Sequence, residues 1–148
     1  MKGFGLSDIG LVRERNEDSF LWIPPFLGAV ADGMGGHQGG QEASKMAITV
    51  AENKLKPENQ PSKGQFESWL AETVEDINLQ IFHKSQENQI LLGMGTTLSI
   101  VYFFENQMYW ADVGDCRIYL FRDGNLKQIT KDHALASSKK KSHILTRA

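Results

Sequence analysis

Three clusters of acidic residues in this chain could bind a hard cation. They are residues 13–18 (RERNED), the pair Asp32-Gly33, and residues 112–115 (DVGD). Clustered carboxylates repel one another unless they are protonated or bridged by a cation. Oxygen ligands suit Mg²⁺ or Mn²⁺ better than Zn²⁺, since the His and Cys ligands of a zinc site are missing. Any one cluster alone is typical of a solvated turn, but the three together favour a metal site.

The Asp32-Gly33 pair is placed best for this chemistry. The apolar run over residues 27–31 predicts a buried strand that ends at Asp32, followed by a glycine-rich turn. A glycine without a Cβ lets the backbone come close to a ligand. We therefore expect the Asp32 carboxylate and the Gly33 carbonyl to face a cation. The alternative interpretation is a strand–turn–helix corner in which Asp32 only accepts backbone hydrogen bonds.

Arg13, beside the first acidic cluster, indicates phosphoryl chemistry. A guanidinium binds two phosphate oxygens in a geometry that lysine does not reproduce. No Gly-x-x-x-x-Gly-Lys motif occurs, so a nucleotide-binding loop is not indicated. Cys116 follows Asp115, whose charge raises a thiol pKa, and we interpret it as a strand residue and not as a nucleophile. His37 is a candidate general acid, with a turn residue near a helix start as the favoured interpretation.

Composition limits the function classes. The chain has 148 residues, 41% hydrophobic and 23% charged, with a net charge of −2, which predicts one folded domain. The mild acidity argues against nucleic-acid binding. No apolar window is long enough to span a membrane, and the N-terminus lacks a signal-peptide pattern. A single cysteine excludes an internal disulfide framework and fits a reducing compartment, so we expect a cytoplasmic protein.

Hydrophobic periodicity predicts strands, then two helices, then an antiparallel meander. This order indicates an α+β fold with helices packed on a sheet face. The basic run at 137–141 is interpreted as a solvated loop, with a phosphate-attracting patch as the alternative. We expect strands over residues 3–9, 19–23, 26–31, 96–104, 107–113, 117–122 and 126–130, and helices over 41–55 and 64–85, with a hairpin turn at Asp123-Gly124.

Several motifs, in this order and spacing, resemble the metal-dependent (PPM, type 2C) protein Ser/Thr phosphatase family in its bacterial form. The resemblance spans nearly the whole chain. The matching stretches are residues 7–10 (SDIG), 13–18 (RERNED), 30–36 (VADGMGG), 93–97 (GMGTT), 111–119 (ADVGDCRIY) and 122–133 (RDGNLKQITKDH), and residues 144–148 (ILTRA) look like the next block of the family.

The resemblance implies an α-β-β-α sandwich, in which two antiparallel sheets are flanked by helices. It also implies that Asp32 bridges two Mn²⁺ or Mg²⁺ ions and that Gly33 gives its carbonyl to one of them. Glu17 and Asp18 would act on the ions largely through waters, and Asp115 would match the acid near a third, looser ion. Arg13 would bind the substrate phosphate while a metal-activated water hydrolyses phosphoserine or phosphothreonine.

The chain departs from the family pattern at three places. Met34 stands where many eukaryotic members have His, so the general acid is unassigned, although bacterial members commonly share this Met. Cys116 replaces the usual Ser. The later Asp-Gly and Asp-Asn blocks, whose aspartates complete the metal site, are missing, and the flap region between residues 132 and 144 is short.

These departures leave two hypotheses for residues 1–148, taken as a single partial phosphatase domain whose C-terminal portion is truncated. The first is a metal-dependent protein Ser/Thr phosphatase, a monomeric hydrolase that dephosphorylates substrates of a Ser/Thr kinase in signalling. The alternative is a catalytically impaired pseudophosphatase or regulatory phosphoprotein-binding module. The retained acids favour the first, and the missing acids favour the second, because ligand count and charge set metal affinity.

Overall fold

The computed structural model of the chain describes residues 1–35 and 39–133. Its regular elements are mostly those that the sequence pattern predicts, with boundaries shifted by a few residues. In chain order they are β1 (Asp18–Ile23), β2 (Leu27–Met34), α1 (Gly39–Lys54), the 3₁₀-helix η1 (Pro57–Asn59), α2 (Phe66–Glu87), the 3₁₀-helix η2 (Gln89–Leu91), β3 (Gly95–Thr96), β4 (Leu98–Phe104), β5 (Gln107–Val113), β6 (Tyr119–Arg122) and β7 (Asn125–Gln128).

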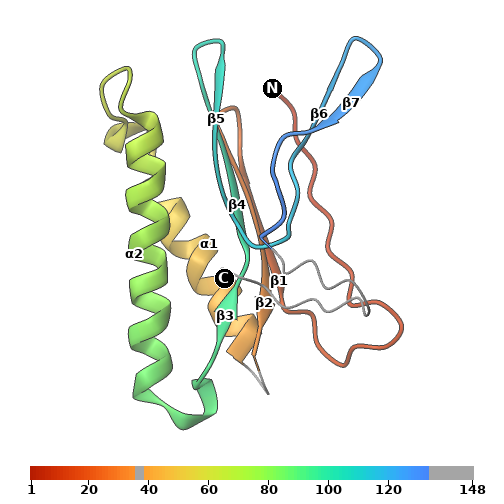
Figure 1. Cartoon of the computed structure of the whole chain (residues 1–148), viewed down its shortest axis with the longest axis vertical. Helices are drawn as coiled ribbons and strands as arrows, with labels where there is room; N and C mark the ends of the chain where they lie inside the picture. Colours follow the sequence, from red (N-terminus) through yellow and green to blue (C-terminus); the bar gives the residue numbers. More distant parts are fainter. Residues whose placement is uncertain (36–38, 134–148) are drawn as a thin grey trace.

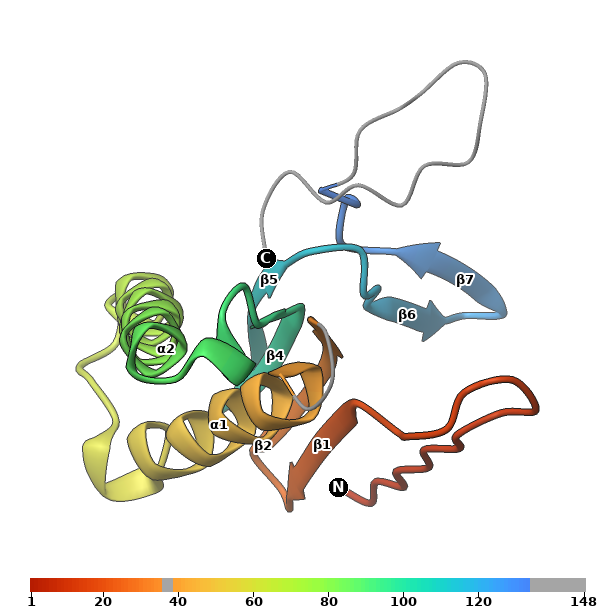
Figure 2. The same cartoon turned by 90° about the horizontal axis from the view of Figure 1, so that it is seen from below.

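The strands form two antiparallel sheets. The larger has the order β1-β2-β4-β5, with the short β3 also pairing with β2, and the smaller is the β6-β7 hairpin. Both helices cover one face of the larger sheet, while the β6-β7 hairpin and the N-terminal segment lie on its other side (Figures 1 and 2). The predicted α+β class, with antiparallel sheets and packed helices, is confirmed.

Alternation along β2 decides which side chains meet the helices. Val30 and Asp32 are exposed on the face away from α1, whereas Ala29 and Ala31, which alternate with them, are buried. The helix surface that covers β2 is also built from small residues, so α1 approaches the strand closely. The buried alanines on the two elements are Ala29, Ala31, Ala43, Ala47 and Ala51.

The start of α2 is fixed by an aromatic cluster around Phe66, which is fully buried. Its ring stacks on Phe104 at 4.8 Å and on Tyr109 at 4.6 Å between ring centroids, and meets Trp69 edge-on at 5.8 Å. Such ring pairs stabilise a core beyond the area that they bury. The cluster therefore joins α2 to β4 and β5, and the apolar stripe predicted for this helix is core.

Two expectations about strands are wrong. Residues 3–9 form no strand; instead, an ideal Cβ on Gly3 would lie 2.3 Å from the Trp22 ring, and one on Gly5 would lie 2.2 Å from Phe20. The segment thus packs through bare glycine backbone onto aromatic rings and makes no hydrogen-bonded ladder. The strand expected over residues 26–31 does not end before Asp32. As β2 it continues to Met34, because its last two residues pair with β3.

The predicted hairpin turn at Asp123-Gly124 is confirmed. Asp123 has φ 52° and Gly124 has φ 76°, the left-handed backbone that two-residue hairpin turns favour. His37, the basic run at 137–141 and the block at 144–148 lie outside the described residues. Within residues 1–35 and 39–133, no helix has the length and apolar character needed to cross a bilayer.

Replacing Phe66 by Ala should lower the free energy of unfolding by about 3–5 kcal/mol, because it leaves a cavity in the aromatic cluster. Urea denaturation followed by circular dichroism measures this change. Phe82→Ala, on the same helix but with Phe82 57% exposed, is the matched control and should cost less than about 1 kcal/mol. Equal losses in the two variants would contradict the assignment of Phe66 to the core.

Candidate functional site

The β1-β2 ladder places two predicted site residues side by side. Asp18 and Asp32 are direct register partners in this antiparallel pair. Opposite residues in such a pair project their side chains to the same face of the sheet. Both carboxylates are exposed, on the face that the helices leave uncovered. The pairing therefore brings together acids from two different sequence clusters.

The electrostatics of Asp32 show which other charges lie near it. Partial burial raises the pKa of this carboxyl above its ordinary value, and the charges of Asp18 and Asp115 raise it further. A hydrogen bond with Asp18 acts in the same direction, while the Arg13 guanidinium lowers the pKa. Three carboxylates and one guanidinium from three predicted clusters thus share one neighbourhood.

A hydrogen-bonded network ties Asp18, the first residue of β1, to the segment that precedes the strand. The Asp18 N–H donates to Asn16 Oδ1 at 3.0 Å, and Ser7 Oγ donates to Asp18 Oδ2 at 3.3 Å. Asn16 Nδ2 closes the network by donating to Ser7 Oγ at 2.7 Å. The N-terminal segment, although not a strand, therefore helps to orient an acid of the candidate site.

Arg13 is held only weakly. Its Nη1 lies 3.6 Å from Glu17 Oε2, and the Arg13 side chain is 76% exposed against 18% for Glu17. Because the arginine side of this long pair is in solvent, the pair contributes little to stability, and the guanidinium can exchange Glu17 for a stronger anion at small cost.

Gly33 is required by a close contact between β2 and the start of α1. An ideal Cβ on Gly33 would lie 1.9 Å from the Gly40 carbonyl oxygen and 2.8 Å from the Glu17 carbonyl oxygen. The Gly33 N–H donates to that same Glu17 carbonyl at 3.1 Å. A Cβ on Gly40 would in turn lie 2.7 Å from Glu17 Oε1. The two glycines therefore seat the Glu17 carboxylate beside the first turn of α1, where a helix favours negative charge.

Asp112, from the third acidic cluster, lies on β5 opposite Ser99. The Ser99 hydroxyl donates to Asp112 Oδ1, but Oδ2 is buried and finds no partner among the described residues. Burial raises the pKa of Asp112, the Ser99 hydrogen bond and His133 lower it, and Asp132 and Asp115 raise it. This incompletely satisfied acid is within electrostatic reach of Asp115.

The donor chemistry around Asp32 suits a hard divalent cation. The residues whose charges raise its pKa are carboxylates, and oxygen ligands are what Mg²⁺ and Mn²⁺ prefer. Across residues 1–35 and 39–133, however, no three His, Cys, Asp or Glu side chains are gathered tightly enough to form a metal-binding group. These residues suit a cation in their charge and in their ligand type, but their side chains are too far apart here to coordinate one ion together.

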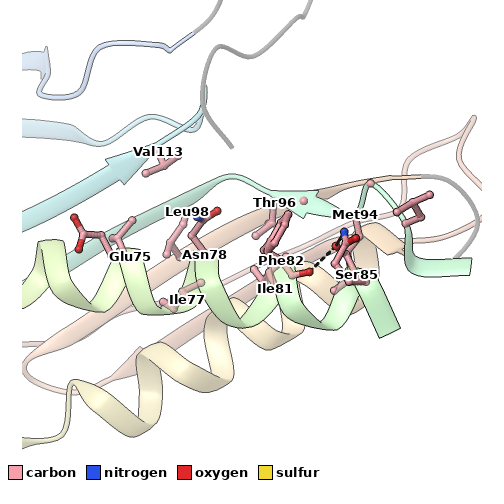
Figure 3. A pocket seen from close by; sticks show the side chains of 15 residues that line it. Glu75, Ile77, Asn78, Ile81, Phe82, Ser85, Met94, Thr96, Leu98 and Val113 are labelled. Carbon is pink, nitrogen blue, oxygen red and sulfur yellow. Dashed lines mark hydrogen bonds between the residues drawn. The ribbon is translucent and has the colours of Figure 1, made fainter. Parts of the chain in front are cut away.

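The apolar cleft between α2 and strands β3 to β5 is a separate feature (Figure 3). It has a volume of about 660 Å³ and contains none of the predicted site residues. It opens on the helix side of the larger sheet, whereas Asp32 faces the other side. Residues that line it include Glu75, Asn78, Ile81, Phe82, Met94 and Leu98.

Sequence reasoning included Thr97 in the family-like stretch of residues 93–97 but assigned it no role in the site. Its N–H donates to the Asp32 carbonyl at 2.9 Å, and its side-chain hydroxyl accepts from the Asp32 N–H at 2.9 Å. The available signal was two consecutive threonines between a glycine and an apolar strand, which strand propensity alone accounts for. Cys116 lies in the loop between β5 and β6 and not in a strand, so that part of its interpretation is wrong. Burial raises the pKa of its thiol, a Thr97 hydrogen bond lowers it, and the charges of Asp32 and Asp115 raise it again, which agrees with the expectation that it is a poor nucleophile.

The family model of protein phosphatase 2C matches residues 8–144 of the chain. A relative from Listeria monocytogenes serotype 4b, serine/threonine phosphatase stp, is 36% identical over 135 residues, which cover 87% of this chain and 53% of the relative. The chain thus spans about half the length of this curated relative.

Solved structures give the same picture. The catalytic domain of the serine/threonine protein phosphatase PstP, crystallised in complex with two manganese ions, superposes with a TM-score of 0.78 at 40% identity, over 87% of this chain and 54% of that one. PstP is a protein of Mycobacterium tuberculosis. The phosphatase Stp1 from Staphylococcus aureus gives a TM-score of 0.82 at 30% identity, over 99% of this chain and 69% of that one.

A methyl group at Gly33 should push apart the backbones of β2 and α1 beside the site. Gly33→Ala drives a Cβ into the Gly40 carbonyl and should lower the free energy of unfolding by about 3 kcal/mol. Gly95→Ala is the matched control on the paired strand β3, since its Cβ would meet only the flexible end of Met34 at 3.3 Å. Urea denaturation should show less than about 1 kcal/mol for the control, and a similar cost for both would refute the close contact.

Asp112→Asn should stabilise the chain at neutral pH in metal-free buffer. A raised folded-state pKa means that the acid favours folding fully below its ordinary value of 3.8, and that this contribution is lost as pH rises through the folded pKa. Asn does not ionise. The free energy of unfolding of the variant should therefore exceed that of wild type at pH values above the folded-state pKa, and the difference should shrink toward pH 3.8. Thermal unfolding across this pH range measures the difference.

Asn125→Gln, which exchanges one amide for another in the exposed β6-β7 hairpin, is the control for that series and should differ from wild type by the same amount at every pH. A constant difference between Asp112→Asn and wild type from acid to neutral pH would show that titration of Asp112 is not its cause.

Proposed function

The chain belongs to the protein phosphatase 2C family, and on this premise we propose that it acts in the hydrolysis of phosphoserine and phosphothreonine in proteins. The observation that carries the proposal is the position of Asp18 directly opposite Asp32 on neighbouring strands, with the charges of Asp115 and Arg13 also acting on the pKa of Asp32. Residues 1–148 would form part of a single phosphatase domain.

In this proposal, Asp32 is the central metal ligand. Asp18, Glu17 and Asp115 would hold Mn²⁺ or Mg²⁺ with it, directly or through waters, and Gly33 would contribute its carbonyl. The mutual repulsion around Asp32 supports this, since bound positive charge would relieve it. The two manganese ions in the PstP structure are consistent with such a pair, and a third ion near Asp115 is part of the proposal. When bound, the ions supply an activated water and Lewis-acid stabilisation of charge on the phosphate.

Arg13 would bind and orient the substrate phosphate. Its guanidinium has the forked geometry that matches two phosphate oxygens. Its 3.6 Å pair with Glu17, in which the Arg13 side chain is exposed, is weak enough to be replaced by the more highly charged phosphate. Asp32, although crowded by other acids, stays in place because Thr97 and the β1-β2 ladder hold its backbone.

The substrates would be phosphoproteins produced by a Ser/Thr kinase, and the protein would act as a monomer in cytoplasmic signalling. The relatives are named Ser/Thr phosphatases, which favours catalysis over the alternative of a binding module without activity.

The test is hydrolysis of a chromogenic aryl phosphate by the chain, with and without millimolar manganese. The expected result is manganese-dependent turnover that falls by at least about 100-fold in Asp32→Ala. Arg13→Ala should chiefly raise KM, because it removes a phosphate contact made in both ground and transition states.

Asp123→Ala, an exposed turn variant, is the matched control and should keep wild-type turnover. Circular dichroism must show that every variant is folded. Manganese-independent turnover, or equal turnover in Asp32→Ala and wild type, would contradict the proposed role of Asp32.

A further inference from the structure

The strand ladder changes its hydrogen-bond pattern at Asp32. The register of β2 against β4 and β3, with Val30 opposite Ser99 and Gly33 opposite Thr96, puts Thr97 opposite Asp32. A regular hydrogen-bonded pair would exchange two N–H···O=C bonds. Here the Thr97 N–H donates to the Asp32 carbonyl at 2.9 Å, but the Asp32 N–H donates to the Thr97 hydroxyl at 2.9 Å. A side chain has replaced one backbone acceptor.

The carbonyl released by this exchange is satisfied locally. Thr96 Oγ1 donates to the Thr97 carbonyl at 2.9 Å. Thr96 and Thr97 are only 5% and 2% exposed, so an unpaired group here would carry the cost of a buried polar atom. The two threonines therefore complete a local pattern in which the backbone of Asp32 depends on one hydroxyl.

The same Thr97 side chain also contacts the loop that carries Asp115. Its Oγ1 lies 3.0 Å from Cys116 Sγ and shares a hydrogen bond with it. An ideal Cβ on Gly114, whose φ is 108°, would lie 2.6 Å from Thr97 Cγ2, so the loop backbone rests on the Thr97 methyl group. One buried side chain thus contacts both neighbours of the site, the strand of Asp32 and the loop of Asp115.

We propose that Thr97 is a positioning residue that sets where Asp32 stands relative to Asp115, through its hydroxyl bonds to the Asp32 amide and the Cys116 thiol. This inference rests on the proposed function, because the consequence of the positioning is metal affinity. Residues that orient metal ligands affect affinity without touching the metal, commonly by about 10- to 100-fold.

The test compares Thr97→Val and Thr97→Ser in the whole chain. Valine keeps the shape and the contact with Gly114 but lacks the hydroxyl, whereas serine keeps the hydroxyl and lacks the methyl group. We expect Thr97→Val to weaken manganese binding by about 10-fold in isothermal titration and to speed amide hydrogen exchange at Asp32. Thr97→Ser should restore both toward wild type.

Thr73→Val is the matched control. Thr73 is 1% exposed, and its hydroxyl donates to the Trp69 carbonyl at 2.8 Å within α2, so the change removes a buried hydroxyl far from Asp32. It should leave manganese affinity and Asp32 exchange at wild-type values, whatever its effect on thermal unfolding. A merely structural role of Thr97 would make the two valine variants alike.

The outcomes separate the inference from the function on which it rests. If wild type binds manganese and Thr97→Val binds it equally well, or if Thr97→Ser is as impaired as Thr97→Val, the role of the hydroxyl is overturned. If wild type binds no manganese, the proposed function is overturned and the claim about affinity with it. Exchange at Asp32 then decides the positioning role alone, and equal protection in Thr97→Val and wild type refutes it.

Discussion

Two carboxylates, Asp18 and Asp32, stand directly opposite each other on neighbouring strands, and like charges in that position destabilise a sheet. Asp115 adds a third negative charge whose effect reaches Asp32. The ladder between β1 and β2 cannot relieve this repulsion without giving up the pairing that buries the other face. The fold therefore carries an unbalanced concentration of negative charge at one place, which only protonation, Arg13 or a cation can offset.

The opposite face of the same strands supplies the stability that tolerates this charge. Small residues on β2 and α1 let the helix pack tightly on the strand. The backbones come so close at Gly33 and Gly40 that no side chain fits between them. Because strand side chains alternate, the packing that buries Ala31 also commits Asp32 to the open face. Core and site are thus two consequences of one alternating strand.

Much of this arrangement could be predicted from the sequence. Hydrophobic periodicity predicted both helices, because it is a property of neighbouring residues. The acid clusters predicted Asp18, Asp32 and Asp115 as one group, because three clusters together favour a metal site more than any one alone. What could not be predicted depends on partners distant in the chain. That β2 continues past Asp32 follows from pairing with β3, more than 60 residues later. The glycines of residues 3–9 gave no sign that they pack on aromatic rings. Thr97 lay in a family-like stretch, but the partners of its hydroxyl, Asp32 and Cys116, are distant in the chain.

Paramagnetic broadening of the backbone amide signals by substoichiometric Mn²⁺ tests the central claim most directly. If the charge around Asp32 is a cation site, the amides of Asp18, Asp32, Gly33 and Asp115 should broaden first, while those that line the α2 cleft, such as Glu75, keep their intensity. Broadening spread evenly over the exposed acids, or centred on Glu75 and Asp76, would contradict the account, because the three carboxylates would then hold no cation in common.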